Sequence, residues 1–226
     1  MIKNILHLGD ASAYFDFGSE VNEQVNSRVI SYFIKIKELQ KQIDGIINLT
    51  PSYNKLIISF DLNKINFKKI KEIVQDLKVD IQNKKNNKKI EIPICCEEGL
   101  SLDFKRLNKL TGKSKLEILE YFFNKEYFCY MTGFIAGMPF LGDLNENIRC
   151  DRLETPRVKM PKGSVGITEQ FANIYTFESP GGWNIIGNTP RKIFDEKNLD
   201  QPALVNPGDK VSFYQITKEE YLNWNE

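Results

Sequence analysis

The sequence has 226 residues, of which 31 are basic and 30 acidic, so its formal net charge is +1. This balance produces no overall field that would draw the chain to nucleic acid or to an anionic membrane surface. The apolar stretches are too short for a signal peptide or a membrane span. We therefore expect a cytoplasmic protein that has neither nucleic acid nor a membrane as its partner.

Side chains that bind metals are sparse in this sequence. His7 is the single histidine, and the four cysteines, at positions 95, 96, 129 and 150, contain no Cys-x-x-Cys pair. A zinc site generally uses several histidine or cysteine ligands at characteristic spacings. We therefore expect buried free thiols and no metal site.

The N-terminal part alternates between strand and helix patterns. The expected elements are strand 13–17, helix 21–41, strands 46–50 and 55–61, helix 67–77 and strand 89–95. This βαββαβ order is that of the ferredoxin-like fold, in which a four-stranded antiparallel sheet carries both helices on one face. We place the domain boundary after residue 88, so that residues 1–88 form a ferredoxin-like α/β domain and residues 89–226 form a second domain.

The second domain begins with two short helix patterns and continues with many short apolar runs that glycine and proline separate. The expected strands are 127–133, 163–167, 173–177, 183–187, 192–194 and 210–214. Numerous short strands with this punctuation indicate a β-barrel or a sandwich. The whole chain is therefore expected to be an α+β protein.

One glycine-rich stretch, 133–142, interrupts a strand pattern and carries Gly133, Phe134 and Pro139. Such a loop lets the backbone approach a ligand closely, although a tight apolar corner of the barrel has the same composition. We include these three residues among the candidates for substrate binding.

A second stretch places Arg157 and Lys162 on either side of a rigid turn, with Ser164 close behind. Two cations and a hydroxyl suit a carboxylate or a phosphate group, and ordinary surface exposure of the cations is equally compatible with this pattern. Arg157 and Ser164 are candidate catalytic residues.

The segment from Glu178 to Trp183 combines more functional groups than a turn between strands requires. It contains a carboxylate, the hydroxyl of Ser179, the free N–H groups of Gly181 and Gly182, and an indole ring. Such a loop can bind an oxyanion, with Glu178 as a general base or hydrogen-bond acceptor. We predict that these residues line one cleft together with Arg157 and Ser164.

Independent catalysis receives no support from short motifs. The sequence contains neither Gly-x-x-x-x-Gly-Lys-Ser/Thr nor Gly-x-Ser-x-Gly, so a phosphate-binding P-loop and a nucleophile elbow are both absent. The chain is therefore expected to work as part of a larger enzyme.

The same motifs resemble a known family, the B subunit of 5-oxoprolinase, also called allophanate hydrolase subunit 1 or KipI-like and related to a segment of urea carboxylase. The resemblance extends in order over nearly the whole chain. The segments that carry it include Val25-Asn26-Ser27-Arg28-Val29, Tyr130-Met131-Thr132-Gly133-Phe134, Gly163-Ser164-Val165-Gly166-Ile167, Ser179-Pro180-Gly181-Gly182-Trp183 and Asn206-Pro207-Gly208-Asp209.

The resemblance implies a cyclophilin-like β-barrel for residues 89–226. It also implies a hetero-oligomeric hydrolase in which this chain acts with a carboxyltransferase-like C subunit and an A subunit. Such complexes open 5-oxo-L-proline to L-glutamate with hydrolysis of ATP, which enters at the level of the complex. No biotin site is expected in this chain.

The chain departs from the family pattern at residues 168–173, where members usually carry Ala-Gly-x-Gln-Thr-Gly, so that a Gln-Thr pair becomes Phe171-Ala172 and a glycine becomes Asn173. It also departs at Phe122, where many members carry histidine, and at Ala136, where members carry proline. These differences motivate an alternative, a KipI-type inhibitor that binds a sporulation histidine kinase. A further alternative is an accessory component of a urea or amide carboxylase and allophanate hydrolase system.

Overall fold

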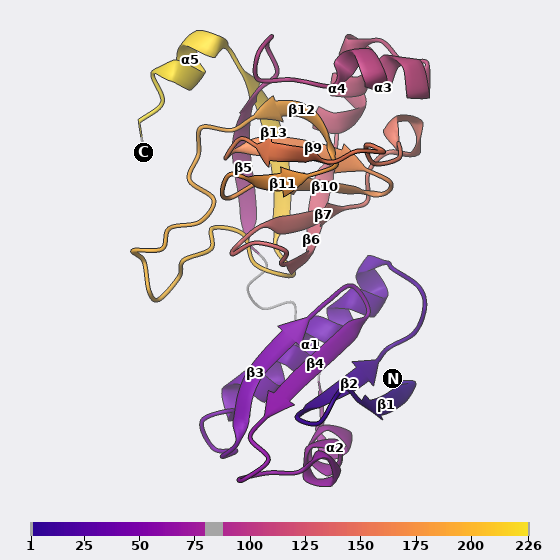
Figure 1. Ribbon diagram of the computed structural model, residues 1–226, viewed down its shortest axis with the longest axis vertical. Helices are drawn as coiled ribbons and strands as arrows, with labels where there is room; N and C mark the ends of the chain where they lie inside the picture. Colours follow the sequence, from indigo (N-terminus) through magenta and orange to yellow (C-terminus); the bar gives the residue numbers. More distant parts are fainter. Residues whose placement is uncertain (1, 80–87, 226) are drawn as a thin grey trace. The chain divides into compact units, whose positions relative to one another are not determined.

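The computed structural model describes residues 2–79 and 88–225. The chain divides into two compact units, Met1–Asn86 and Asn87–Glu226, which Figure 1 shows in indigo to purple and in magenta to yellow respectively. We describe each unit by itself.

The first unit contains a four-stranded antiparallel sheet with the strand order β1-β2-β4-β3. Its strands are β1 (Asn4–His7), β2 (Ser12–Asp16), β3 (Ile46–Pro51) and β4 (Lys55–Phe60). β4 lies between β2 and β3, which the helix α1 connects, and this is a split βαβ arrangement.

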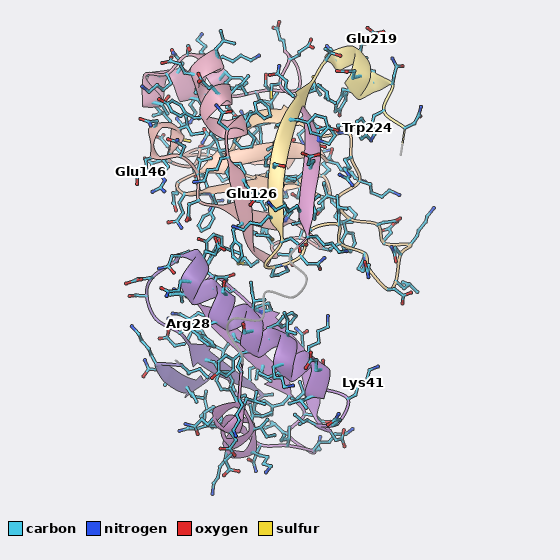
Figure 2. All side chains as sticks on the ribbon, turned by 180° about the vertical axis from the view of Figure 1, so that it is seen from behind. Arg28, Lys41, Glu126, Glu146, Glu219 and Trp224 are labelled. Carbon is cyan, nitrogen blue, oxygen red and sulfur yellow. The ribbon has the colours of Figure 1, made fainter. Side chains whose placement is uncertain are left out.

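Two helices, α1 (Glu23–Leu39) and α2 (Phe67–Asp76), pack on this sheet. Asn22 and Asn66 cap them, because each side chain accepts a hydrogen bond of 2.9 Å from a backbone N–H of the first turn. Apolar residues from both helices join alternate residues of β2 and β4 in a single core, so both helices cover one face of the sheet. Figure 2 marks Arg28 in the first half of α1 and Lys41 just beyond its end.

The prediction that strand 89–95 completes this sheet is wrong. β5 (Lys89–Cys95) belongs to the second unit, where it pairs in parallel with β13 and antiparallel with β12. Ile90, Ile92 and Ile94 lie in the barrel core, whereas the outer place beside β2 is taken by β1. The sequence pattern does not reveal β1, because most of its four residues are exposed and show no strong alternation.

The second unit is built around a closed barrel with the strand order β10-β7-β6-β13-β5-β12-β9, which confirms the expected α+β class and the barrel. Besides β5 its strands are β6 (Glu126–Thr132), β7 (Pro139–Gly142), β9 (Ser164–Thr168), β10 (Phe171–Ile174), β12 (Asn184–Asn188) and β13 (Lys210–Ile216). Figure 2 marks Glu126 at the beginning of β6.

Further elements surround the barrel, as Figure 1 shows. They are the helices α3 (Phe104–Thr111), α4 (Lys115–Phe123) and α5 (Lys218–Leu222), the short helix η1 (Glu146–Ile148), and a two-stranded ribbon of β8 (Arg157–Met160) and β11 (Ser179–Gly181). Phe122 of α4 packs into the barrel core against Tyr127 and Phe213, with ring centroids 5.3 and 4.8 Å apart.

Three details of the second unit differ from the sequence-based prediction. β7 lies in the stretch expected to be a loop, and β11 lies inside the segment expected to be a functional loop. Both contain proline and glycine, which weaken a strand pattern although the edge of a sheet tolerates them. Residues 192–194 form no strand, and Phe194 makes only an isolated bridge with Ala203.

Candidate functional site

The outer face of the barrel carries a buried polar group beneath the β8–β11 ribbon. Ala172 and Ile174 of β10 belong to the barrel core, so Asn173 between them faces outward. Its Oδ1 lies 2.8 Å from the position that a Cβ of Gly166 would take, and Trp183 lies 2.9 Å from the same point. Glycine at position 166 therefore lets the Asn173 amide and Cβ of Trp183 approach the strand.

Asn173, Tyr175, Ser179 and Trp183 form what we call the covered cluster. All four side chains are buried. Phe140 of β7 completes its apolar wall, because the Phe140 and Trp183 rings meet edge to face with centroids 5.6 Å apart. The cluster thus combines an amide, two hydroxyls and aromatic surface away from water.

Several polar atoms of the covered cluster lack partners. Within the described residues, both amide atoms of Asn173 and the Oγ of Ser179 are buried without a hydrogen bond of standard geometry. Leaving such atoms unpaired costs roughly 1–3 kcal/mol each. Burial raises the pKa of Tyr175, and the adjacent Asn173 amide and the backbone N–H of Trp183 oppose this to a smaller extent. The Tyr175 hydroxyl is therefore protonated at neutral pH.

Gly181 is required where β11 crosses Tyr175. A Cβ at this position would lie 2.8 Å from Cζ of Tyr175 and 2.9 Å from Cγ of Met160, distances that real side chains do not adopt. A Cβ at the neighbouring Gly182 would meet nothing closer than 3.5 Å.

We expect Gly181→Ala to lower the free energy of unfolding by about 1–3 kcal/mol, because the added methyl group overpacks this contact. Gly182→Ala is the matched control and should change it by less than about 0.5 kcal/mol. Urea unfolding of the two variants checks the prediction. Equal effects of the two substitutions would show that the contact with Tyr175 is not tight.

Arg157 holds the β8–β11 ribbon against the barrel. Its guanidinium donates two hydrogen bonds, of 3.0 and 2.6 Å, to the carboxylate of Asp103 at the beginning of α3. The Asp103 side chain is only 5% exposed and also accepts a bond of 2.6 Å from the backbone N–H of Ile185. Arg157 is therefore engaged in a structural pair, which leaves it poorly placed to hold a substrate carboxylate.

The other predicted catalytic residues lie in different surroundings. Ser164 is buried at the beginning of β9, where its carbonyl accepts a bond of 2.9 Å from Tyr175 N–H. Glu178 is 57% exposed and forms an ion pair of 3.0 Å with Lys159. The structure therefore does not bring the Glu178 carboxylate into the covered cluster.

The predicted substrate-binding residues are partly brought together. Ser179, Gly181, Gly182 and Trp183 follow one another along and just after β11. Pro139 is buried at the beginning of β7, next to Phe140 of the cluster wall. Gly133 and Phe134 lie in the turn between β6 and β7, where Phe134 has φ 68° and is 68% exposed.

A pocket of about 300 Å³ opens at the end of the barrel next to the cluster, with Tyr175 in its lining. Lys162, Thr176, Thr189, Arg191, Lys192 and Tyr221 also line it. Sequence reasoning singles out only Lys162 of these, because the others come from segments that meet only in the folded barrel. Sequence reasoning also misses Asn173 and Asp103, because nothing in the sequence around a single Asn or Asp indicates which residues it contacts.

The described residues contain neither a group of metal-binding side chains nor a helix that could span a membrane. No group of three or more His, Cys, Asp or Glu side chains among them is arranged to hold a metal ion. In the same part of the chain, none of the helices has the length and apolar character needed to cross a membrane.

Comparisons with known proteins extend over both units. The family model described as carboxyltransferase domain, subdomain C and D, matches residues 3–205. The B subunit of 5-oxoprolinase from Bacillus subtilis (strain 168) is 32% identical over 234 residues, which cover 98% of this chain and 96% of that relative.

Two solved structures share the fold. TTHA0988 matches with a TM-score of 0.80 and 25% identity over 91% of this chain, and the urea amidolyase of Kluyveromyces lactis matches with a TM-score of 0.76 and 21% identity over 96%. The chain spans only 40% and 15% of these longer proteins. With a family model over most of its length and a relative matched end to end, the chain belongs to the family of 5-oxoprolinase B subunits, whose fold is that of carboxyltransferase subdomains C and D.

Proposed function

We propose that this chain is the B subunit of a hydrolase complex that opens 5-oxo-L-proline to L-glutamate with hydrolysis of ATP. It would act with a carboxyltransferase-like C subunit and an A subunit. The end-to-end match to a relative of that name supports the assignment. The family departures at Phe171-Ala172 replace a polar pair with apolar residues, whereas Asn173 places an amide on the outer face of the same strand.

The end-to-end match to a 5-oxoprolinase B subunit is the observation that carries the proposal, and the buried amide of Asn173 is a group of this chain that suits such a substrate. A lactam presents an N–H donor and a C=O acceptor on the same side of its ring, and a primary carboxamide offers the complementary acceptor and donor. Both amide atoms of Asn173 are buried and make no hydrogen bond of standard geometry. Phe140 and Trp183 provide apolar surface beside it for the ring methylene groups. The covered cluster therefore matches the chemistry of a small lactam.

The buried position of the Asn173 amide, which a ligand cannot reach in the isolated chain, explains why the chain would work only within a complex. The Asn173 amide is fully buried, so a ligand reaches it only when its neighbour Trp183, which follows β11, moves. The ribbon of β8 and β11 is a separate two-stranded sheet, and Arg157 is one of its ties to the barrel. We propose that docking of the C subunit displaces the ribbon and opens the cluster to the lactam.

Glu178 keeps its proposed role as the general base in the assembled complex. Its exposed position beside Lys159 leaves it free to be covered by a partner protein. We expect Glu178→Gln to reduce glutamate release by the complex at least about 100-fold, the usual contribution of a positioned base. The unfolding midpoint should not change, because the side chain is exposed. Lys159→Met is the control for loss of the ion pair, and full activity of the Gln variant would remove Glu178 from the mechanism.

The proposed function is tested by omission. Purified A and C subunits are mixed with 5-oxo-L-proline and ATP, with or without this chain, and glutamate is measured. We expect release only when the chain is present. The same rate without it would refute the assignment.

The alternatives have weaker support. The likeness to urea amidolyase has 21% identity and covers 15% of that protein, so it supports the fold alone. Inhibition of a histidine kinase rests on the same family resemblance and on no separate contact among the described residues. We therefore put forward the role in a lactam hydrolase.

A further inference from the structure

The pocket at the end of the barrel is formed by segments that are distant in the sequence. Gly163 precedes β9, Thr176 follows β10 and Thr189 follows β12, and because these strands are antiparallel neighbours, the three positions meet at one end of the barrel. Tyr221 of α5 closes the side, and Figure 2 marks this helix by Glu219 and by Trp224 just beyond it.

The charges that line the pocket are all of one sign. Lys162, Arg191 and Lys192 contribute cations, and none of the residues described as lining the pocket is acidic. The carboxylate of Asp195 lies outside the lining, 3.6 Å from the Lys192 ammonium. The ammonium of Lys162 lies 6.0 Å from the centre of the Phe177 ring. The charged side chains that line the pocket are therefore all cationic, which suits an anion.

Hydrogen bonds hold the pocket lining in place before any ligand arrives. The guanidinium of Arg191 donates a bond of 2.6 Å to the carbonyl of Glu91, and its backbone N–H donates one of 3.2 Å to the Thr189 hydroxyl. The Tyr221 hydroxyl donates to Asn188 Oδ1 at 2.9 Å, and the amide of Asn188 donates to the Lys162 carbonyl at 2.9 Å. A preorganised site of this kind loses little freedom when it binds.

The volume limits the size of the ligand. About 300 Å³ is the lower end of the range of about 300–1,000 Å³ for small-molecule sites, so the pocket suits a molecule of amino-acid size. We infer that this pocket is a binding site for a small oxyanion, either a carboxylate such as that of 5-oxo-L-proline or a phosphoryl group, held by Lys162, Arg191 and Lys192. Only the identity of the carboxylate rests on the proposed function.

Calorimetric titration of the isolated full chain tests the inference with inorganic phosphate, with 5-oxo-L-proline and with its neutral carboxamide. We expect phosphate or 5-oxo-L-proline to bind, more weakly as salt is added, and the carboxamide not to bind. Competition between the two anions would assign one shared oxyanion site. Binding of phosphate alone would assign the site to a phosphoryl group, and binding of 5-oxo-L-proline alone to a carboxylate.

Two variants with the same change of charge locate the binding. Lys162→Met should weaken it about tenfold, as expected for loss of one charge-assisted hydrogen bond. Lys159→Met removes a cation from β8, outside the pocket lining, and should leave it unchanged. Absence of binding by both anions, or equal binding by the Lys162 variant, would overturn the inference. Glutamate release by the complex is measured separately, so the proposed function can hold while this site fails.

Discussion

Replacing Asp103 with alanine is expected to lower the free energy of unfolding of the barrel unit by about 2–4 kcal/mol. Removing one partner of a buried ion pair typically costs about 3–5 kcal/mol, because the other charge is left uncompensated. The side chain of Arg157 is 31% exposed, so water recovers part of that cost. The variant also leaves the Ile185 N–H without its acceptor. Both effects act where the ribbon joins the barrel.

Urea unfolding followed by tryptophan fluorescence measures this change, because Trp183 and Trp224, both tryptophans of the chain, lie in the second unit. Lys159→Met breaks the exposed pair with Glu178 and should cost only about 0–1 kcal/mol. The double variant of Asp103→Ala with Arg157→Met should cost less than the sum of the single changes, because the two groups are in contact. Strict additivity, or a cost below about 1 kcal/mol for Asp103→Ala, would contradict the role of this pair.

Replacing Asn173 with leucine is expected to separate stability from activity. The side chains have similar size, and the change removes two buried polar atoms that make no hydrogen bond of standard geometry, so the free energy of unfolding should stay the same or rise by about 1 kcal/mol. Glutamate release by the complex should fall about 10- to 100-fold, because the lactam loses two hydrogen bonds. An unpaired polar group that costs stability is expected at a functional position.

Asn184→Leu is the matched control in the same unit. Asn184 is also fully buried, but its amide donates to the Asp151 carbonyl at 2.9 Å and accepts from Arg106 at 3.0 Å. We expect this variant to lose about 2–3 kcal/mol, because its partners remain buried and unpaired. A similar loss for Asn173→Leu, or unchanged glutamate release, would contradict our interpretation of Asn173.

Local sequence patterns predict elements well where they are strong. α1 and α2 show clear apolar periodicity, and their observed bounds lie within a few residues of the expected ones. β5 is expected in the wrong sheet because its pairing with β13 joins residues more than a hundred positions apart. The sequence pattern of a strand indicates which of its faces are buried, but it does not identify the strand with which it pairs.

The same limit applies to the site. Composition alone points to the segment from Glu178 to Trp183, because a carboxylate, a hydroxyl, two glycines and a tryptophan within six residues are an unusual local signal. The structure places Ser179 and Trp183 of this segment in the covered cluster and leaves the Glu178 carboxylate outside it. The partner of Arg157 is Asp103, 54 positions earlier, and no local pattern connects them. Asn173 can be recognised as part of the site only in the folded structure, where Gly166 and Trp183 lie beside it.

The central claim is that the chain is a subunit of a lactam hydrolase. The most direct test is to determine which substrate stimulates ATP hydrolysis by the complex. ATP hydrolysis and glutamate formation are measured for the purified complex of this chain with its A and C subunits, in parallel with 5-oxo-L-proline and with urea. We predict that ATP is hydrolysed in step with glutamate when 5-oxo-L-proline is supplied and that urea has no effect. Hydrolysis of ATP that depends on urea, without glutamate from 5-oxo-L-proline, would contradict the claim.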